Sequence, residues 1–290
     1  MKVGLIDFGE ISNNSNGIET IYETINNAQL AESFGFSRYW LTEHYLRGVA
    51  WRNSELIINL IAGYTEKIKV GAAGVCLDFA LPFRVAQDFT LLTNLFPNRI
   101  DLGFAKGGAN IQEREELSKD INPSNFFERI LKIKHFLDDK NEHLSVTPPN
   151  GLQPSMWLLG TSNNSTNFAS KQGMYFSLSL FHSIDGNLPS PEIIKNFRNI
   201  FFKENGCLPE SNIVVSAFCS KKESSIINEK KTRKNVRINV CGGPEECIEQ
   251  ILKLKELYNT DEIIFLNLAQ DKEEKILLME TLNQIEIKCN

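Results

Sequence analysis

The chain has 290 residues, of which 42% are hydrophobic and 23% are charged, and its formal net charge is −5. This composition is typical of a folded globular protein with a large apolar core, and it excludes extensive disorder. The acidic balance gives no electrostatic reason to expect nucleic acid or an anionic membrane as a partner, so we expect a small-molecule substrate.

Short apolar runs rich in β-forming residues alternate with longer stretches of helical periodicity, a pattern typical of βαβ units around a parallel sheet. We expect eight strands, at residues 2–7, 38–42, 68–77, 99–104, 156–159, 175–181, 212–218 and 262–268. We expect helices at residues 19–34, 54–64, 83–96, 125–137, 165–171 and 190–204, from 244 onward, and at 272–285. Eight such pairs predict one α/β domain over residues 1–290, a (β/α)8 TIM barrel.

Two details of this assignment concern helix starts and a charged segment. Ser54 is predicted to cap the second helix, with Glu55 in its first turn. The segment 221–237 is charged and poor in apolar residues, so we expect a flexible loop there. Its basic cluster leaves a second interpretation open, a surface for an anionic substrate or a leader peptide.

The cysteines and the start of the chain indicate the cellular setting. The six cysteines show no CxxC or zinc-like spacing, so we expect mostly buried thiols and no metal site. Cys241 and Cys247 flank an expected helix start, and the alternative for them is a reactive thiol. The first residues lack a signal peptide's apolar stretch and no window approaches the ~20 apolar residues of a membrane span, so a cytoplasmic location is expected.

Polar residues that follow barrel strands are the candidates for chemistry, because active sites of such barrels lie at the carboxyl ends of the strands. The second strand ends in Thr42, Glu43, His44 and Tyr45. A histidine there can act as an acid, a base or a hydrogen-bond donor near neutral pH. The competing interpretation is a histidine that only forms hydrogen bonds within a polar loop.

Three further strand ends suggest a ligand with a flat ring and a phosphate. Val70 to Gly74 places small residues in the third strand, which favours close approach of a ligand or, alternatively, tight interior packing. The fourth strand leads into Lys106 and Gly107, which either contact an anionic ring or form an ordinary glycine turn. After the fifth strand, Gly160, Thr161, Ser162 and Ser165 precede a helix, where they either cradle a phosphate or simply cap the helix.

Three stretches of the chain resemble the bacterial luciferase-like family of flavin-dependent oxidoreductases. The main stretch is residues 34–108, with FGFSRYWLTEHY followed by IKVGAAGVCLDFALPFRVAQDFTLLTNLFPNRIDLGFAKGG. The others are WLLGTSNNSTNFASKQG at 157–173 and CGGPEE at 241–246. The resemblance implies a luciferase-like (β/α)8 barrel that binds FMN or a deazaflavin, usually reduced beforehand by a separate reductase.

The resemblance also implies roles for individual residues. His44 matches the active-site histidine, and Glu43 beside it is expected to support it. Ala73 and Gly74 match a bond against the flavin ring that is often a nonprolyl cis peptide. The phosphate positions match Thr161, Ser162 and Ser165 after Gly160, and Lys106 with Gly107 matches a contact to ring and phosphate.

Departures from the family pattern limit what is carried over. Lys106 stands where an arginine is frequent, which removes the planar bidentate fork but keeps the charge. Ala105 offers no thiol where luciferase has a reactive cysteine, so light emission is not expected. The connection from Phe218 to Pro244, after strand seven, is shorter than the family's usual insertion, which commonly supplies a lid that excludes water.

The sequence thus predicts a monooxygenase that uses reduced FMN and O2 on a small organic or natural-product substrate. One alternative is an oxygen-independent flavin or deazaflavin reductase of an activated double bond, perhaps in a peptide-derived substrate. Another is a catalytically idle flavin-binding subunit. A homodimer is expected, because the family often pairs through the helices nearest strands two and three.

Overall fold

The structure is a computed structural model that describes residues 1–12, 15–45, 47–105, 115–116, 125–138, 141, 143–182, 187–233 and 236–289. Two of the predicted site residues, Lys106 and Gly107, lie outside the described residues. Side chains are described as far as Ile285.

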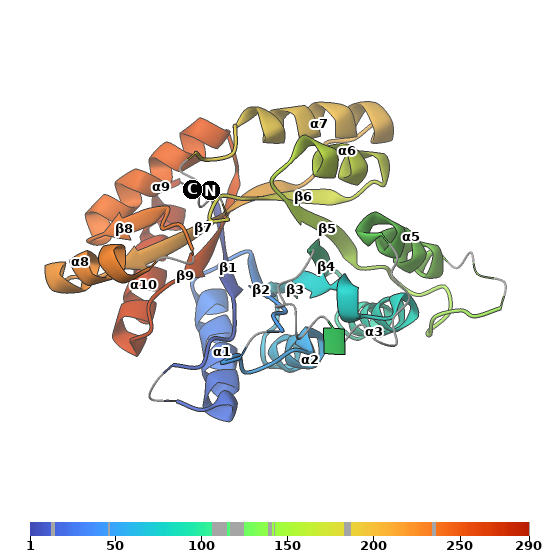
Figure 1. The fold of residues 1–290 in the computed structure, drawn as a ribbon, viewed down its shortest axis with the longest axis horizontal. Coiled ribbons are helices and arrows are strands. Elements are labelled where there is room, and N and C mark those ends of the chain that lie inside the picture. The colour runs from blue at the N-terminus through green and yellow to red at the C-terminus, as the bar shows by residue number, and fades with distance from the viewer. Residues whose placement is uncertain are drawn as a thin grey trace. The chain divides into compact units, whose positions relative to one another are not determined.

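Nine parallel-sheet strands occur in the described part of the chain (Figure 1). They are β1 (Lys2–Asp7), β2 (Arg38–Leu41), β3 (Lys69–Cys76), β4 (Ile100–Ala105), β5 (Ser155–Gly160), β6 (Tyr175–Ser179), β7 (Ser211–Cys219), β8 (Val240–Gly242) and β9 (Glu262–Asn267). They pair in the order β6-β5-β4-β3-β2-β1-β9-β7-β8, and β6 also pairs with β7. Eight strands therefore close a ring, with β8 as a short addition beside β7, and the predicted TIM barrel is confirmed.

Helices follow most of the strands, as the sequence periodicity predicts. They are α1 (Gly17–Ser33), α2 (Ser54–Tyr64), α3 (Pro82–Leu95), α5 (Phe126–Leu137), α6 (Asn163–Lys171), α7 (Glu192–Asn205), α8 (Glu223–Thr232), α9 (Pro244–Tyr258) and α10 (Lys272–Cys289), with a 3-10 turn η1 (Leu77–Phe79) after β3. Pro82 and Pro244 each occupy a first helical position, where the missing N–H costs no hydrogen bond.

The chain divides into two compact units. The first comprises Met1–Asp7, Leu30–Tyr39 and Leu158–Asn290, and the second comprises Phe8–Gln29 and Trp40–Trp157. In the first unit, one side of β7 pairs in parallel with β9. The other side of β7 pairs in parallel first with β6 and then with β8. In the second unit β3 pairs in parallel with β4, and the register shifts between Ala72 and Val75. Both sets of strands are almost wholly buried, as expected for strands covered on both faces.

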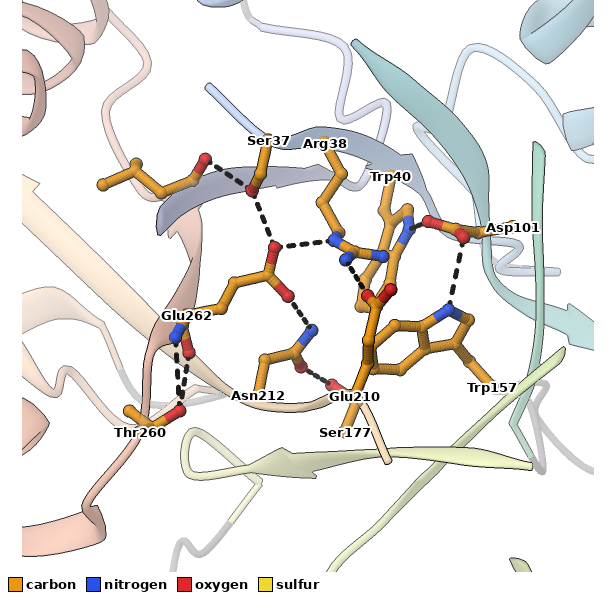
Figure 2. Close-up of polar contacts among 11 residues, drawn as sticks. Ser37, Arg38, Trp40, Asp101, Trp157, Ser177, Glu210, Asn212, Thr260 and Glu262 are labelled. Carbon is orange, nitrogen blue, oxygen red and sulfur yellow. Dashed lines mark hydrogen bonds and ion pairs between the residues drawn. The ribbon is translucent and has the colours of Figure 1, made fainter. Parts of the chain in front are cut away.

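A buried ion-pair network joins the strand starts of the first unit (Figure 2). Arg38, only 1% exposed, donates to Glu262 over 2.8 Å and to Glu210 over 2.7 Å. Asn212 donates to the other oxygen of Glu262 over 2.9 Å and accepts from Ser177 over 2.6 Å. Because Arg38, Asn212 and Glu262 stand at or near the amino ends of their strands, this network lies away from the catalytic ends and stabilises the fold.

The second unit contains a smaller polar cluster in its core, also drawn in Figure 2. Trp40 and Trp157 donate their indole N–H groups to the two oxygens of buried Asp101, over 2.9 and 3.2 Å. Gly71 faces Asp101, and a Cβ at position 71 would overlap the Asp101 carbonyl. Tight strand packing therefore accounts for this glycine.

Two predictions about local structure were wrong. The segment 221–237, expected as a flexible loop, contains helix α8, whose residues are all at least partly exposed. Strand β8 follows this segment and was not predicted. Ser54 does not cap α2, because Asn53 holds that position and Ser54 is the first helical residue. The backbone N–H and hydroxyl of Ser54 instead donate to Glu43 at the end of β2.

Candidate active site

The segment after β2 is fixed by a tryptophan and a glycine in the second unit. The Trp51 indole donates to the Thr42 carbonyl over 3.0 Å. Gly9 has a φ of +66°, and a Cβ there would lie 2.8 Å from the Trp51 ring, so glycine meets two requirements at once. Backbone bonds from Ala50 to Gly9 and from Ile11 to Gly48 hold this loop against the residues that precede Trp51.

His44 is held in a defined position by a hydroxyl and an aromatic ring. Its Nδ1 lies 2.9 Å from the hydroxyl oxygen of Thr42. The centroid of its ring is 4.7 Å from that of Phe8, and the side chain is half-buried. A hydrogen bond at one ring nitrogen sets the tautomer, and hence which nitrogen exchanges a proton.

Glu43 points into the protein and connects three elements. One carboxylate oxygen accepts from the Ser54 hydroxyl over 2.6 Å and from the Ser54 N–H over 3.3 Å, and the other accepts from the Cys76 N–H over 2.8 Å. The side chain is buried, and this burial raises the pKa of Glu43 to about 7 despite these hydrogen bonds. Glu43 thus links the segment of His44 to the start of α2 and to the end of β3.

The end of β3 contains the predicted pair of small residues in an irregular backbone. The Ala73–Gly74 peptide bond is cis, as the sequence resemblance implies. A Cβ at Gly74 would lie 2.7 Å from backbone atoms of Gly103, Phe104 and Ala105 in β4. Packing against β4 therefore requires glycine at position 74. Tyr45 closes the neighbouring loop, with its ring centroid 4.6 Å from that of Phe79 in η1.

The first unit carries the predicted phosphate loop between β5 and α6. Ser162 is the N-cap of α6 and accepts from the Ser165 N–H over 3.4 Å. The two serine hydroxyls are 3.2 Å apart, and Thr161 and Ser162 are exposed. A Cβ at Gly160 would lie 2.9 Å from the Ser165 side chain, so this loop also depends on glycine.

Sequence reasoning missed His182, which follows β6. Its Nδ1 lies 2.7 Å from the Ser179 hydroxyl, its ring lies 4.3 Å from that of Phe181, and desolvation lowers its pKa. His182 lies three residues beyond Ser179, the last residue of β6, and directly after the strand that the sequence predicted to end at residue 181. A polar residue just past a strand end is the signal that identifies it.

In the second unit, the structure connects Glu43 and His44 with the end of β3. In the first unit, it brings together Gly160, Thr161, Ser162 and Ser165 in one loop. Among the described residues, no group of three or more His, Cys, Asp or Glu side chains is arranged to hold a metal ion. Within the same residues, no helix has the length and apolarity needed to cross a membrane.

Comparison with known proteins decides the family. The family model described as luciferase-like monooxygenase matches residues 1–187. The chain belongs to the luciferase-like monooxygenase family. Members of the luciferase-like class are flavin-dependent oxidoreductases, so the protein is an enzyme of that type.

Two Bacillus subtilis (strain 168) proteins are among the luciferase-like relatives. The protein YceB is 26% identical, with 98% of this chain and 99% of the relative covered. The N-acetyl-S-alkylcysteine monooxygenase is 30% identical over 69% of this chain and 62% of its own length.

Solved structures share the luciferase-like fold. The structure of apo-MsnO8 has a TM-score of 0.84 at 21% identity, covering 99% of this chain and 98% of its own. The oxygenating constituent of a 3,6-diketocamphane monooxygenase from Pseudomonas putida was solved with FMN and has a TM-score of 0.71 at 16% identity, covering 98% of this chain and 96% of its own. An alcohol dehydrogenase dependent on F420, solved with an F420–acetone adduct, has a TM-score of 0.64 at 13% identity, covering 98% of each chain.

Proposed function

We propose that the protein is a monooxygenase that uses reduced FMN and dioxygen to oxidise a small organic substrate in the cytoplasm. The proposal rests on the fixed position of the His44 imidazole, which contacts Thr42 and Phe8. A hydrogen bond from Cys76 to Glu43 connects the segment of His44 to the end of β3, where Ala73 and Gly74 lie. When bound, reduced FMN supplies the electrons that activate dioxygen, so that one oxygen atom enters the substrate and the other leaves as water.

The residues of the chain fit a flavin with one phosphate. The exposed hydroxyl of Ser162 and the half-buried hydroxyl of Ser165 stand at the first turn of α6, where backbone N–H groups and the helix dipole favour an anion. The loop at Gly160 to Ser165 contains no lysine or arginine, which favours a single phosphate held by neutral donors. Lys106 and Gly107, which match a ring and phosphate contact in the family, complete our proposed binding set.

His44 is proposed to exchange a proton with the substrate or the flavin ring. The Thr42 hydroxyl holds Nδ1, so the imidazole keeps one orientation while its other nitrogen acts. Glu43 is proposed as a positioning residue, because its carboxylate is engaged by Ser54 and Cys76. The apolar contact with Phe8 limits water around the histidine.

The decisive experiment follows labelled oxygen. The enzyme receives reduced FMN from a separate flavin reductase, 18O2 and a panel of candidate substrates, including thioethers, since a relative is an N-acetyl-S-alkylcysteine monooxygenase. We expect one 18O atom per product and loss of product formation in His44→Ala. Turnover that persists without oxygen would contradict the proposal and indicate hydride transfer to a double bond instead, whereas turnover unaffected by His44→Ala would indicate that the histidine is dispensable.

The choice of cofactor is tested by direct binding. We propose FMN rather than a deazaflavin, and calorimetry under anaerobic conditions with reduced FMN and reduced F420 measures the preference. Tighter binding of F420 would reverse this part of the proposal without affecting the fold or the family.

We further propose a homodimer that forms through α2 and α3. On α2, Leu56 and Tyr64 are 63% and 62% exposed and Leu60 lies between them on the same face, while α3 exposes Leu91 and Leu95. Apolar residues at this spacing normally face a protein surface. Light scattering of the wild-type protein and of Leu56→Arg tests the dimer, and Leu208→Arg, at an exposed site outside these helices, is the matched control.

A further inference from the structure

Two buried thiols meet where β7 ends and α9 begins. Cys219 is the last residue of β7 and Cys247 lies near the start of α9, and each is 0% exposed. Cys219 pairs with Gly242 in the ladder between β7 and β8, and the Cys247 sulfur lies 3.5 Å from the Gly242 carbonyl oxygen. The Cys247 sulfur also lies 3.7 Å from the carbonyl oxygen of Phe218, the residue before Cys219. Two cysteines 28 positions apart in the sequence are thereby held at the same junction of β7, β8 and α9.

A surface pocket lies beside this buried pair. The pocket has a volume of about 240 Å3 and is lined by Ser220, which directly follows Cys219, and by Leu277 and Glu280 of α10, among others. The Cys219 sulfur lies 3.7 Å from the Thr281 hydroxyl, which in turn donates to the Leu277 carbonyl over 2.7 Å. The walls of the pocket and the surroundings of Cys219 are thus formed by the same two segments.

The two thiols have different acidities. The neighbouring Cys247 thiol lowers the pKa of Cys219, and the Thr281 hydroxyl lowers it further against the opposing effect of burial. The neighbouring Cys219 thiol and burial raise the pKa of Cys247. Cys219 is therefore the more acidic of the two thiols, as a nucleophilic thiol beside a resolving one should be.

We propose that hydrogen peroxide converts Cys219 and Cys247 into a reversible disulfide that links β7 to α9. The Cys219 thiolate attacks one oxygen of the peroxide, the O–O bond breaks, and a sulfenic acid and one water form once the thiol proton is included. The Cys247 thiol then attacks the sulfenic sulfur, the S–S bond forms, and the S–O bond breaks to release a second water. Two thiols and one peroxide thus give one disulfide and two waters.

The linkage closes the chain segment that contains α8 and β8 into a covalent loop. A disulfide of this loop length stabilises a protein mainly by restricting its unfolded state. We therefore expect the oxidised protein to unfold at a higher temperature than the reduced one, by roughly 5 °C for a chain of this size.

The experiment maps the linkage in the intact protein. Wild-type protein is treated with hydrogen peroxide under native conditions, remaining thiols are alkylated, and the chain is cleaved after Lys, Arg and Glu. Cleavage after Glu is needed because one tryptic fragment contains both Cys207 and Cys219, and another contains both Cys241 and Cys247. We expect a species that joins residues 211–221 to residues 247–249 and that dithiothreitol separates.

Variants supply the control for the neighbouring thiol. Cys241→Ser should retain the linked species and the rise in melting temperature, and Cys247→Ser should lose both. Linkage through Cys241, oxidation confined to exposed Cys207, or overoxidation of Cys219 without a partner would overturn the proposal. Because peroxide is added directly, the result does not depend on whether the enzyme is a monooxygenase.

Discussion

The carboxylate of Glu43 accepts a hydrogen bond of 2.8 Å from the backbone N–H of Cys76, and so joins the end of β2 to the end of β3. This contact places His44, the next residue after Glu43, in a fixed relation to the Ala73–Gly74 bond two residues before Cys76. The loss of a buried carboxylate with these partners should be measurable both in stability and in pH dependence.

Replacing Glu43 by Gln should destabilise the protein by about 1–3 kcal/mol, the usual consequence of leaving a buried donor without an acceptor. One oxygen of the carboxylate accepts from the Cys76 N–H, and the other accepts from the hydroxyl and N–H of Ser54. The amide NH2 group of Gln would face one of these donors and could not accept a hydrogen bond from it. Urea unfolding of wild type and variant measures the difference. Glu256→Gln, which removes the same charge from an exposed position, should change stability by less than 0.5 kcal/mol.

The raised pKa of Glu43 predicts that stability falls as the pH rises. The folded-state pKa is about 7 and the ordinary value is 4.5, so between these pH values the folded protein binds more protons at this site than the unfolded chain. The free energy of unfolding should therefore decrease from pH 5 to pH 8 by about 2–3 kcal/mol through this group, at 1.36 kcal/mol per pKa unit. Glu43→Gln removes this contribution, and an identical pH slope in wild type and variant would contradict it.

The relation between Glu43 and His44 also shows what the sequence reveals and what it hides. Adjacent residues at a strand end suggested an acid and an imidazole side by side. Successive side chains along extended chain point to opposite faces, so the carboxylate of Glu43 turns toward α2 and β3 while His44 contacts Thr42 and Phe8. The alternation was available from the sequence, but the partners Ser54 and Cys76 required the folded chain.

The barrel itself was predictable because strong apolar runs and helical periodicity repeat eight times. The parts that were missed lack such a pattern. Helix α8 buries none of its residues completely, so its sequence has no apolar face to identify it, and β8 has only three residues. A phosphate loop was predicted from hydroxyls before a helix, whereas the packing role of Gly74 against β4 depends on a neighbour 29 or more positions away.

The hydroxyl of Thr42 should matter for catalysis through His44 alone. Thr42→Val removes the hydrogen bond to Nδ1, and we expect kcat to fall about 10-fold, equivalent to a lost hydrogen bond of about 1.4 kcal/mol. His44→Ala should lower kcat by at least ~100-fold, and the double variant should be no slower than His44→Ala. Thr42→Ser, which keeps the hydroxyl, serves as the control. Additive effects in the double variant would show that Thr42 acts elsewhere.

The serines at the start of α6 should distinguish flavins by their phosphate. Ser165→Ala is expected to weaken FMN binding by at least about 10-fold, because a hydrogen bond to a charged group contributes roughly 1.5–3 kcal/mol. Riboflavin, which lacks the phosphate, should bind both proteins equally. Ser162→Ala should show the same selectivity together with about 1 kcal/mol lower stability, since Ser162 also caps the helix. Ser190→Ala, at an exposed serine before α7, should alter neither affinity, and equal losses for FMN and riboflavin would argue against a phosphate site.

The ion-pair network at the opposite end of the strands should affect stability and leave catalysis unchanged. Arg38→Met removes the cation that pairs with Glu262 and Glu210 inside the first unit, and breaking a buried pair in this way typically costs about 3–5 kcal/mol. Glu210→Gln should cost only about 1 kcal/mol, because the Glu210 side chain is 38% exposed and water can solvate the remaining group. Unfolding experiments give both values, and kcat per folded molecule should match wild type in each variant. A larger loss for Glu210→Gln than for Arg38→Met would mean that the exposed partner, and not the buried guanidinium, holds the strand starts together.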